Sequence, residues 1–88
     1  AGTPAYMSPE QRTTGAVSRK TDVYGLGATY FALLTGRGPF SGGTVTEVVA
    51  AQVREPTPDP RDFNPAVPDA VADVVLKAMH PDPMRRYL

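Results

Sequence analysis

The longest apolar stretch of the chain covers residues 23–35 and carries no charged side chain. Thr21 before it can cap a helix, Asp22 suits a first turn, and Gly36 suits the position just past the end, so we predict a helix over residues 21–36. Its large apolar residues leave no wide polar face: Val23, Leu26, Tyr30, Phe31, Leu33 and Leu34. A helix that is apolar all round, yet shorter than the roughly 20 residues of a membrane span, needs protein neighbours. We therefore expect this central helix to be buried on all sides, by more protein than 88 residues can easily supply.

Two further segments show the spacing of amphipathic helices. In residues 44–53 one face is expected to hold Val45, Val48 and Val49, with Gln52 and Val53 beside them. Pro68 opens the other helix, residues 68–79, whose inward side chains are expected to be Val71, Val74, Val75 and Ala78. Residues 55–67 between these helices are rich in proline, and we expect an irregular connector there.

The first twenty residues are predicted to form a loop that contains one short helix. Ser8 supplies an N-cap hydroxyl, Pro9 suits the first helical position, and Glu10 suits the first turn. Gly15 then ends the helix. No segment alternates apolar and polar residues in the manner of a strand, so the predicted fold class is mostly α.

Composition narrows the classes of function. Nine Lys and Arg balance nine Asp and Glu, which argues against a nucleic-acid partner and against an anionic membrane surface. The chain has no cysteine and one histidine, His80, which excludes a disulfide framework and leaves too few of the usual zinc ligands. It has no apolar stretch of membrane-spanning length and no basic-then-apolar leader, so we expect no membrane segment here, no secretory signal and a cytoplasmic location.

Three motifs occur in order along the chain. Residues 2–10 read GTPAYMSPE, residues 20–27 read KTDVYGLG, and residues 82–86 read DPMRR. Together they resemble the helical large lobe of a serine/threonine protein kinase catalytic domain, most closely the bacterial eukaryotic-like kinases. The resemblance covers essentially the whole chain. It runs from the P+1 loop, which supports the substrate residue after the phosphoacceptor, to just before the last helix of the fold.

This resemblance implies that the first motif faces the protein substrate. The residues that it assigns to substrate binding are Gly2, Thr3, Pro4 and Tyr6. In the family, the threonine that matches Thr3 hydrogen-bonds the catalytic aspartate and lysine. The plainer alternative for these residues is a Gly-Pro turn followed by a helix cap, since such turn chemistry is common.

Glu10 matches the glutamate of the family's Ala-Pro-Glu motif, in which Ser8 here replaces the alanine. The resemblance implies that its partner is Arg86, from the Asp-Pro-x-x-Arg pattern, with Arg85 as the competing candidate. A buried, bidentate pair of this kind is a suitable link between distant parts of a chain, because closing a long loop costs entropy. The alternative is two unrelated surface charges, which is the usual fate of exposed ions.

Asp22 matches the aspartate that, in the family, accepts hydrogen bonds from backbone amides of the catalytic loop. An ordinary first-turn acid is the alternative. Gly25 and Gly27 each cost a helix interior about 1 kcal/mol relative to alanine. That cost suggests a close backbone approach by another element, which we expect to be missing from this chain. Gly27 is therefore predicted to have a structural role, as are Asp22 and the Glu10–Arg86 pair.

The chain lacks the parts that carry out phosphoryl transfer in kinases. It has no glycine-rich loop followed by a strand lysine, no His-Arg-Asp sequence and no Asp-Phe-Gly sequence. We therefore expect no catalytic or metal-binding residue in this segment, and we predict that the segment alone is inactive. ATP and Mg²⁺ are expected cofactors of a parent kinase that phosphorylates Ser and Thr of protein substrates.

The expected partners are protein substrates, the rest of the kinase domain and, through residues 44–53, a second kinase molecule. The alternative function is a non-catalytic, kinase-derived interaction module that binds a kinase or its substrates. The central helix distinguishes the two, because a stand-alone module should have a polar face on residues 23–35.

Overall fold

The fold is helical throughout the part of the chain that the structure, a computed structural model, describes: residues 6–15, 18–40 and 42–87. Four α-helices follow one another there: α1 (Pro9–Thr14), α2 (Arg19–Thr35), α3 (Val45–Arg54) and α4 (Asp69–Ala78). Two short 3₁₀ helices are η2 (Pro60–Asp62) and η3 (Pro83–Arg85). No strand occurs within these ranges, which confirms the mostly α prediction.

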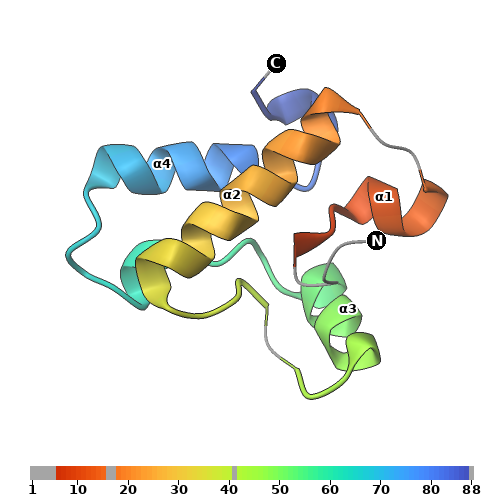
Figure 1. The fold of residues 1–88 in the computed structure, drawn as a ribbon, viewed down its shortest axis with the longest axis horizontal. Coiled ribbons are helices and arrows are strands. Elements are labelled where there is room, and N and C mark those ends of the chain that lie inside the picture. The colour runs from red at the N-terminus through yellow and green to blue at the C-terminus, as the bar shows by residue number, and fades with distance from the viewer. Residues whose placement is uncertain (1–5, 16–17, 41, 88) are drawn as a thin grey trace.

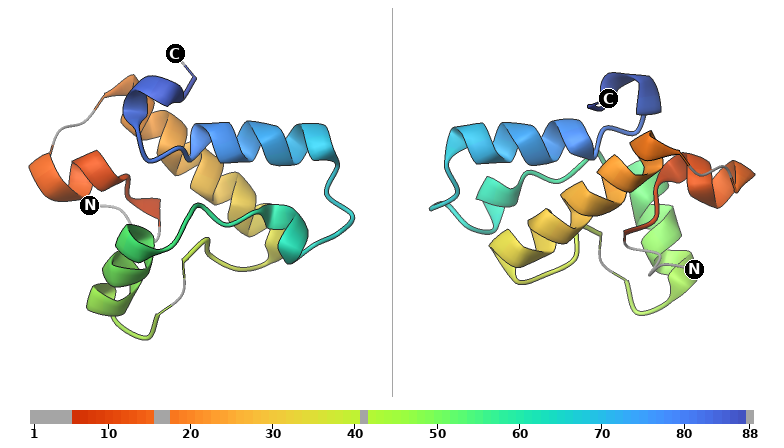
Figure 2. Two further views of the ribbon diagram at one scale, coloured as in Figure 1. Left: turned by 180° about the vertical axis from the view of Figure 1, so that it is seen from behind. Right: turned by 45° about the horizontal axis from the view of Figure 1, so that its top comes forward.

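Helix α2 lies at the centre of the molecule (Figure 1). Helix α4 packs against one side of it, and α1 and α3 lie toward the other side in both views of Figure 2. The core joins α2 to residues of the α2–α3 loop, α3 and α4. Its buried members are Tyr24, Ala28, Phe31, Phe40, Ala51, Val75 and Met79.

The helix ends follow local capping chemistry. The Ser8 hydroxyl accepts a hydrogen bond from the Gln11 N–H, and Gly15 ends α1 with a φ of 73°, so both predicted ends of α1 are confirmed. Gly36 likewise ends α2 with a φ of 74°, as predicted. Glycine adopts this left-handed conformation without the steric cost that other residues incur.

The predicted start of α2 was wrong. Ser18, not Thr21, is the N-cap, and the helix begins at Arg19. The Ser18 hydroxyl accepts from the Thr21 N–H, while the Thr21 hydroxyl accepts from the Ser18 N–H. Because both residues satisfy each other's backbone donors, the helix gains about one turn at its start.

Residues of this chain bury only part of α2, and the expected burial of the rest by further protein stays a prediction. Its inner side is inaccessible at Tyr24, Ala28 and Phe31. Its outer side is open, with Leu26 60% and Leu33 75% exposed. Within the described residues, no neighbour covers the side of α2 that carries Leu26, Tyr30 and Leu33, which leaves this side apolar and bare.

Helix α3 has the predicted length but a different inward face. Thr44 is the N-cap, and its hydroxyl accepts from the Glu47 N–H. Ala51 is buried and Val48 packs against the core, whereas Val45 and Val53 are 62% and 69% exposed. The apolar spacing therefore predicted the helix correctly and placed two valines on the wrong face.

Helix α4 begins one residue later than predicted, at Asp69, with Pro68 as its N-cap. Ala72, Val75 and Ala78 are buried, but Val71 and Val74, expected to face inward, are exposed. Val75 joins the core and Ala78 lies against Gly27 of α2, whereas Val71 and Val74 line a groove beside α2. None of the helices in the described ranges has both the length and the apolarity needed to cross a membrane.

Candidate functional site

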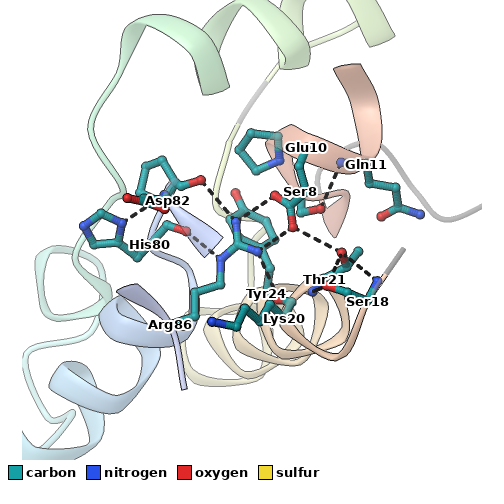
Figure 3. Close-up of polar contacts among 12 residues, drawn as sticks. Ser8, Glu10, Gln11, Ser18, Lys20, Thr21, Tyr24, His80, Asp82 and Arg86 are labelled. Carbon is teal, nitrogen blue, oxygen red and sulfur yellow. Dashed lines mark hydrogen bonds and ion pairs between the residues drawn. The ribbon is translucent and has the colours of Figure 1, made fainter. Parts of the chain in front are cut away.

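A polar cluster joins the two ends of the described chain (Figure 3). Arg86, which follows η3, donates from Nη1 to Oε2 of Glu10 at 2.7 Å and from Nη2 to Oε1 at 2.9 Å. The two residues are 76 positions apart. Arg85, the competing candidate, is exposed and lies 3.8 Å from Asp82. The structure thus brings Glu10 and Arg86 together in the bidentate geometry of a strong ion pair.

The guanidinium of Arg86 is completely enclosed, with a side-chain exposure of 0%. Its remaining N–H groups donate to three backbone carbonyls: His80 at 2.6 Å, Lys20 at 3.0 Å and Pro81 at 3.3 Å. All five guanidinium donors therefore have acceptors. The group also lies 4.9 Å from the centre of the buried Tyr24 ring, where a cation is attracted to the aromatic face. Arg86 thereby holds the turn after α4 against the start of α2.

The carboxylate of Glu10 has a second donor, because the Thr21 hydroxyl bonds Oε2 at 3.1 Å. Burial acts to raise the pKa of this carboxyl, but the hydrogen bonds and charge of Arg86, with the Thr21 bond, outweigh it. The pKa falls from 4.5 to about 2. Glu10 is therefore ionised at every physiological pH, and it links α1, α2 and the chain after η3.

A second polar network, which sequence reasoning did not identify, centres on Gln52 near the end of α3. Its Nε2 donates to the Met7 carbonyl and to the Tyr24 hydroxyl, both at 2.8 Å. Its Oε1 accepts from Nε and Nη2 of Arg12 at 3.0 and 2.6 Å. The sequence feature that could have identified this network is a polar residue at an inward position of an amphipathic helix, because a half-buried amide needs hydrogen-bond partners.

Of the residues predicted to bind substrate, Gly2, Thr3 and Pro4 lie outside the described residues. Tyr6 is half-buried and packs against the core. Its carbonyl oxygen lies 3.8 Å from the point where a Cβ on Gly25 would sit, which is an ordinary contact. The backbone at Tyr6 therefore rests directly on α2.

The two predicted structural residues of α2 lie in different surroundings: Asp22 is exposed, whereas Gly27 is packed against α4. Asp22 is exposed in the first turn of α2, and its carboxylate has no hydrogen-bond or ion-pair partner among residues 6–15, 18–40 and 42–87. A Cβ on Gly27 would lie 2.8 Å from Ala78 Cβ and 3.0 Å from Met79 Cγ. The expectation that the element approaching Gly27 is missing was wrong, because that element is the end of α4. Glycine allows the two helices to pack this closely.

An apolar groove of about 550 Å³ runs between the bare side of α2 and α4. Its walls include Leu26, Tyr30, Val71 and Val74, all of which are exposed, and Tyr87 also lines it. His80, expected at a helix end, lies in the turn after α4 and accepts from the Asp82 N–H through Nδ1. The described residues contain no group of three or more His, Asp or Glu side chains that could hold a metal ion.

Comparison with known proteins identifies the family to which this chain belongs. Residues 1–87 match the protein kinase domain family. The DNA damage-responsive serine/threonine-protein kinase RqkA of Deinococcus radiodurans is 53% identical over 75 residues, which cover 85% of this chain and 11% of that relative. The serine/threonine-protein kinase PrkC of Bacillus subtilis is 41% identical over 86 residues, which cover 98% of this chain and 13% of PrkC.

The serine/threonine-protein kinase Pkn1 of Myxococcus xanthus is 44% identical over 87 residues, 98% of this chain and 12% of that protein. The chain thus spans only about an eighth of the length of these bacterial relatives. Its helices agree with the helical large lobe of the kinase fold. The chain belongs to the protein kinase domain family, as a portion of a serine/threonine kinase catalytic domain.

Proposed function

We propose that this chain is part of a serine/threonine protein kinase that transfers the γ-phosphate of ATP to Ser and Thr hydroxyls of protein substrates. The observation that carries the proposal is the family match over residues 1–87, together with relatives that are all serine/threonine kinases. In this reaction the substrate hydroxyl loses its proton, its oxygen bonds the γ-phosphorus, and ADP leaves with the oxygen that bridged the two phosphates. ATP and Mg²⁺ are thus the proposed cofactors.

The proposed role of this segment is to support the protein substrate and to hold the large lobe together. The substrate-facing segment, residues 2–7, contains the four residues proposed to bind substrate: Gly2, Thr3, Pro4 and Tyr6. It leads directly into α1, which the Glu10–Arg86 pair ties to the end of the chain. Exposed Asp22 is proposed to accept hydrogen bonds from backbone amides of a catalytic loop that lies outside residues 1–88.

The ATP and Mg²⁺ site is proposed to lie elsewhere in the same protein. The residues described here do not fit a metal ion, since they contain no suitable cluster of acidic or histidine side chains. The sequence also lacks the catalytic-loop and metal-binding motifs of kinases. We therefore derive no chemical step from this chain's own side chains, and we propose that residues 1–88 alone are inactive.

The apolar groove between α2 and α4 supports this division of roles. A bare apolar surface of this kind normally marks an interaction with other protein. We propose that other parts of the same catalytic domain cover the groove, which would complete the burial that the sequence of α2 predicts. A non-catalytic module is the alternative, and it would need a separate partner for the same surface.

Protein substrates and the remainder of the kinase domain are the proposed partners. The exposed Val45 and Val53 of α3 are proposed to contribute to a contact with a second kinase molecule. Because ATP is the proposed phosphate donor, we propose that the domain lies in the cytoplasm, whether or not a transmembrane segment lies elsewhere in the protein.

A phosphorylation assay on the natural protein that contains these residues tests the proposal. The protein is incubated with radiolabelled ATP, Mg²⁺ and a general protein substrate, and the phosphoamino acids are identified after acid hydrolysis. We expect phosphoserine and phosphothreonine, and we expect none from the 88-residue chain assayed in parallel. Absence of transfer by the natural protein, or transfer by the 88-residue chain alone, would contradict the proposal.

A further inference from the structure

The carboxamide of Gln52 connects three separate parts of the chain. Its partners lie 28, 40 and 45 positions away, on α2, on α1 and in the residues just before α1. Figures 1 and 2 show the end of α3 beside the chain that leads into α1. Gln52 thus fixes α3 to these segments through polar contacts, in addition to the packing of Ala51 and Val48 on the core.

Every hydrogen-bonding position of this amide is used. A glutamine amide has two N–H donors and an oxygen that accepts two hydrogen bonds. Both donors and both acceptor positions are occupied, and the Arg12 bonds are charge-assisted. The orientation of the amide is chemically fixed, because the Met7 carbonyl can only accept and the Arg12 guanidinium can only donate.

The bond to Met7 acts on the backbone at one defined place. Met7 lies between Tyr6, whose carbonyl rests on α2 at Gly25, and Ser8, the buried N-cap of α1. The chain is therefore held by α2 on one side and by Gln52 on the other, at the junction of the substrate-facing segment and α1. Losing the Gln52 donor would leave the Met7 carbonyl without this partner and free the junction to shift.

We propose that Gln52 is a positioning residue, which places the substrate-facing segment by holding the Met7 carbonyl and so determines how well a protein substrate binds. This inference rests on the proposed kinase function and on the proposed role of residues 2–7. Gln52 itself does not touch substrate. Its effect on ATP is expected to be small, because its bonds reach only α1, α2 and the junction before α1.

Three variants of the complete natural protein separate positioning from general stability. Gln52→Glu keeps the acceptor for Arg12, and the Tyr24 hydroxyl, which accepts from Gln52, can donate to the new carboxylate instead. The variant replaces the donor to Met7 with an oxygen that repels the carbonyl. Gln52→Leu removes every polar contact. Arg54→Gln is the matched control, because Arg54 is the last residue of α3, is exposed, and lies outside the proposed kinase contact over residues 44–53.

Steady-state kinetics with a peptide substrate give the first readout. We expect both Gln52 variants to raise the KM for the peptide about ten-fold, with the KM for ATP within about two-fold of the unaltered protein, as the loss of one or two hydrogen bonds implies. Arg54→Gln should match the unaltered protein. A peptide KM that stays unchanged in Gln52→Glu, or an ATP KM that rises in parallel, would overturn the proposal.

Hydrogen exchange gives a second readout that does not depend on activity. Amide exchange in a fragment spanning residues 2–8 should be about ten-fold faster in Gln52→Glu than in Arg54→Gln. If the unaltered protein transfers no phosphate, the proposed function fails, while exchange still decides the positioning role. Equal exchange in the two variants would refute that role, even if Gln52→Leu failed to fold.

Discussion

Breaking the Glu10–Arg86 pair should destabilise the large lobe strongly and in a coupled way. We expect Glu10→Ala to lower the free energy of unfolding by about 3–5 kcal/mol, because it leaves a fully enclosed guanidinium without its counter-charge. Arg86→Ala should cost a similar amount. It leaves the carboxylate without its main donors, and it removes the bonds to the carbonyls of Lys20, His80 and Pro81.

The structure also sets the size of the coupling between the two residues. The fall in the pKa of Glu10 from 4.5 to about 2 corresponds to about 3 kcal/mol of interaction favouring the ionised carboxylate. Arg86 contributes most to this lowering of the pKa, through its hydrogen bonds and its charge, and a backbone hydrogen bond and the Thr21 hydroxyl supply the rest. We therefore expect the double variant to be about 2–3 kcal/mol more stable than the sum of the single effects predicts.

Urea unfolding of the complete kinase domain, followed by circular dichroism, measures these four stabilities. Arg85→Ala is the control, because this neighbouring arginine is exposed and lies at the edge of ion-pair distance from Asp82. It should change stability by less than about 0.5 kcal/mol. Single effects of Glu10→Ala and Arg86→Ala that simply add, within about 0.5 kcal/mol, would show that the pair does not stabilise the domain as a unit.

Two further predictions concern pH and helix packing. Because folding lowers the pKa of Glu10 to about 2, the contribution of its carboxylate to stability should be fully present above about pH 4.5 and lost as the pH falls toward 2. The difference in unfolding free energy between the unaltered domain and Glu10→Gln, measured by urea unfolding from pH 6 to pH 2, should therefore shrink across that range. A constant difference would count against the ion pair. Gly27→Ala should be about 1–3 kcal/mol less stable than Gly25→Ala, because both variants gain helix propensity but only Gly27→Ala places a Cβ 2.8 Å from Ala78 Cβ. Thermal unfolding of the two variants measures this difference, and equal stability would disprove the close packing.

The sequence predicted the parts of the fold that depend on local chemistry. Ser8, Gly15 and Gly36 were correctly placed at helix ends, because caps and left-handed glycines act within a few residues. The start of α2 was misplaced because Ser18 and Thr21 can both cap. Their reciprocal bonds favour Ser18, and the usual form of this motif has Glu or Gln where Thr21 stands.

Features that depend on packing between distant segments were harder to predict from the sequence. The cost of Gly27 in a helix indicated a close neighbour, but only the packed structure identifies it as Ala78 on α4. The partners of Gln52 are 28 or more positions away, so no local pattern could name them. The Glu10–Arg86 contact was expected only from the family resemblance, since 76 residues separate the two charges.

The central claim is that residues 1–88 form part of a larger kinase catalytic domain. Its most direct test is the intact mass of the natural protein, captured with an antibody against this segment and measured by mass spectrometry. We expect a species of roughly 30 kDa or more, large enough for a complete catalytic domain whose other elements cover the groove beside α2. A stable natural species of 9.4 kDa would contradict it.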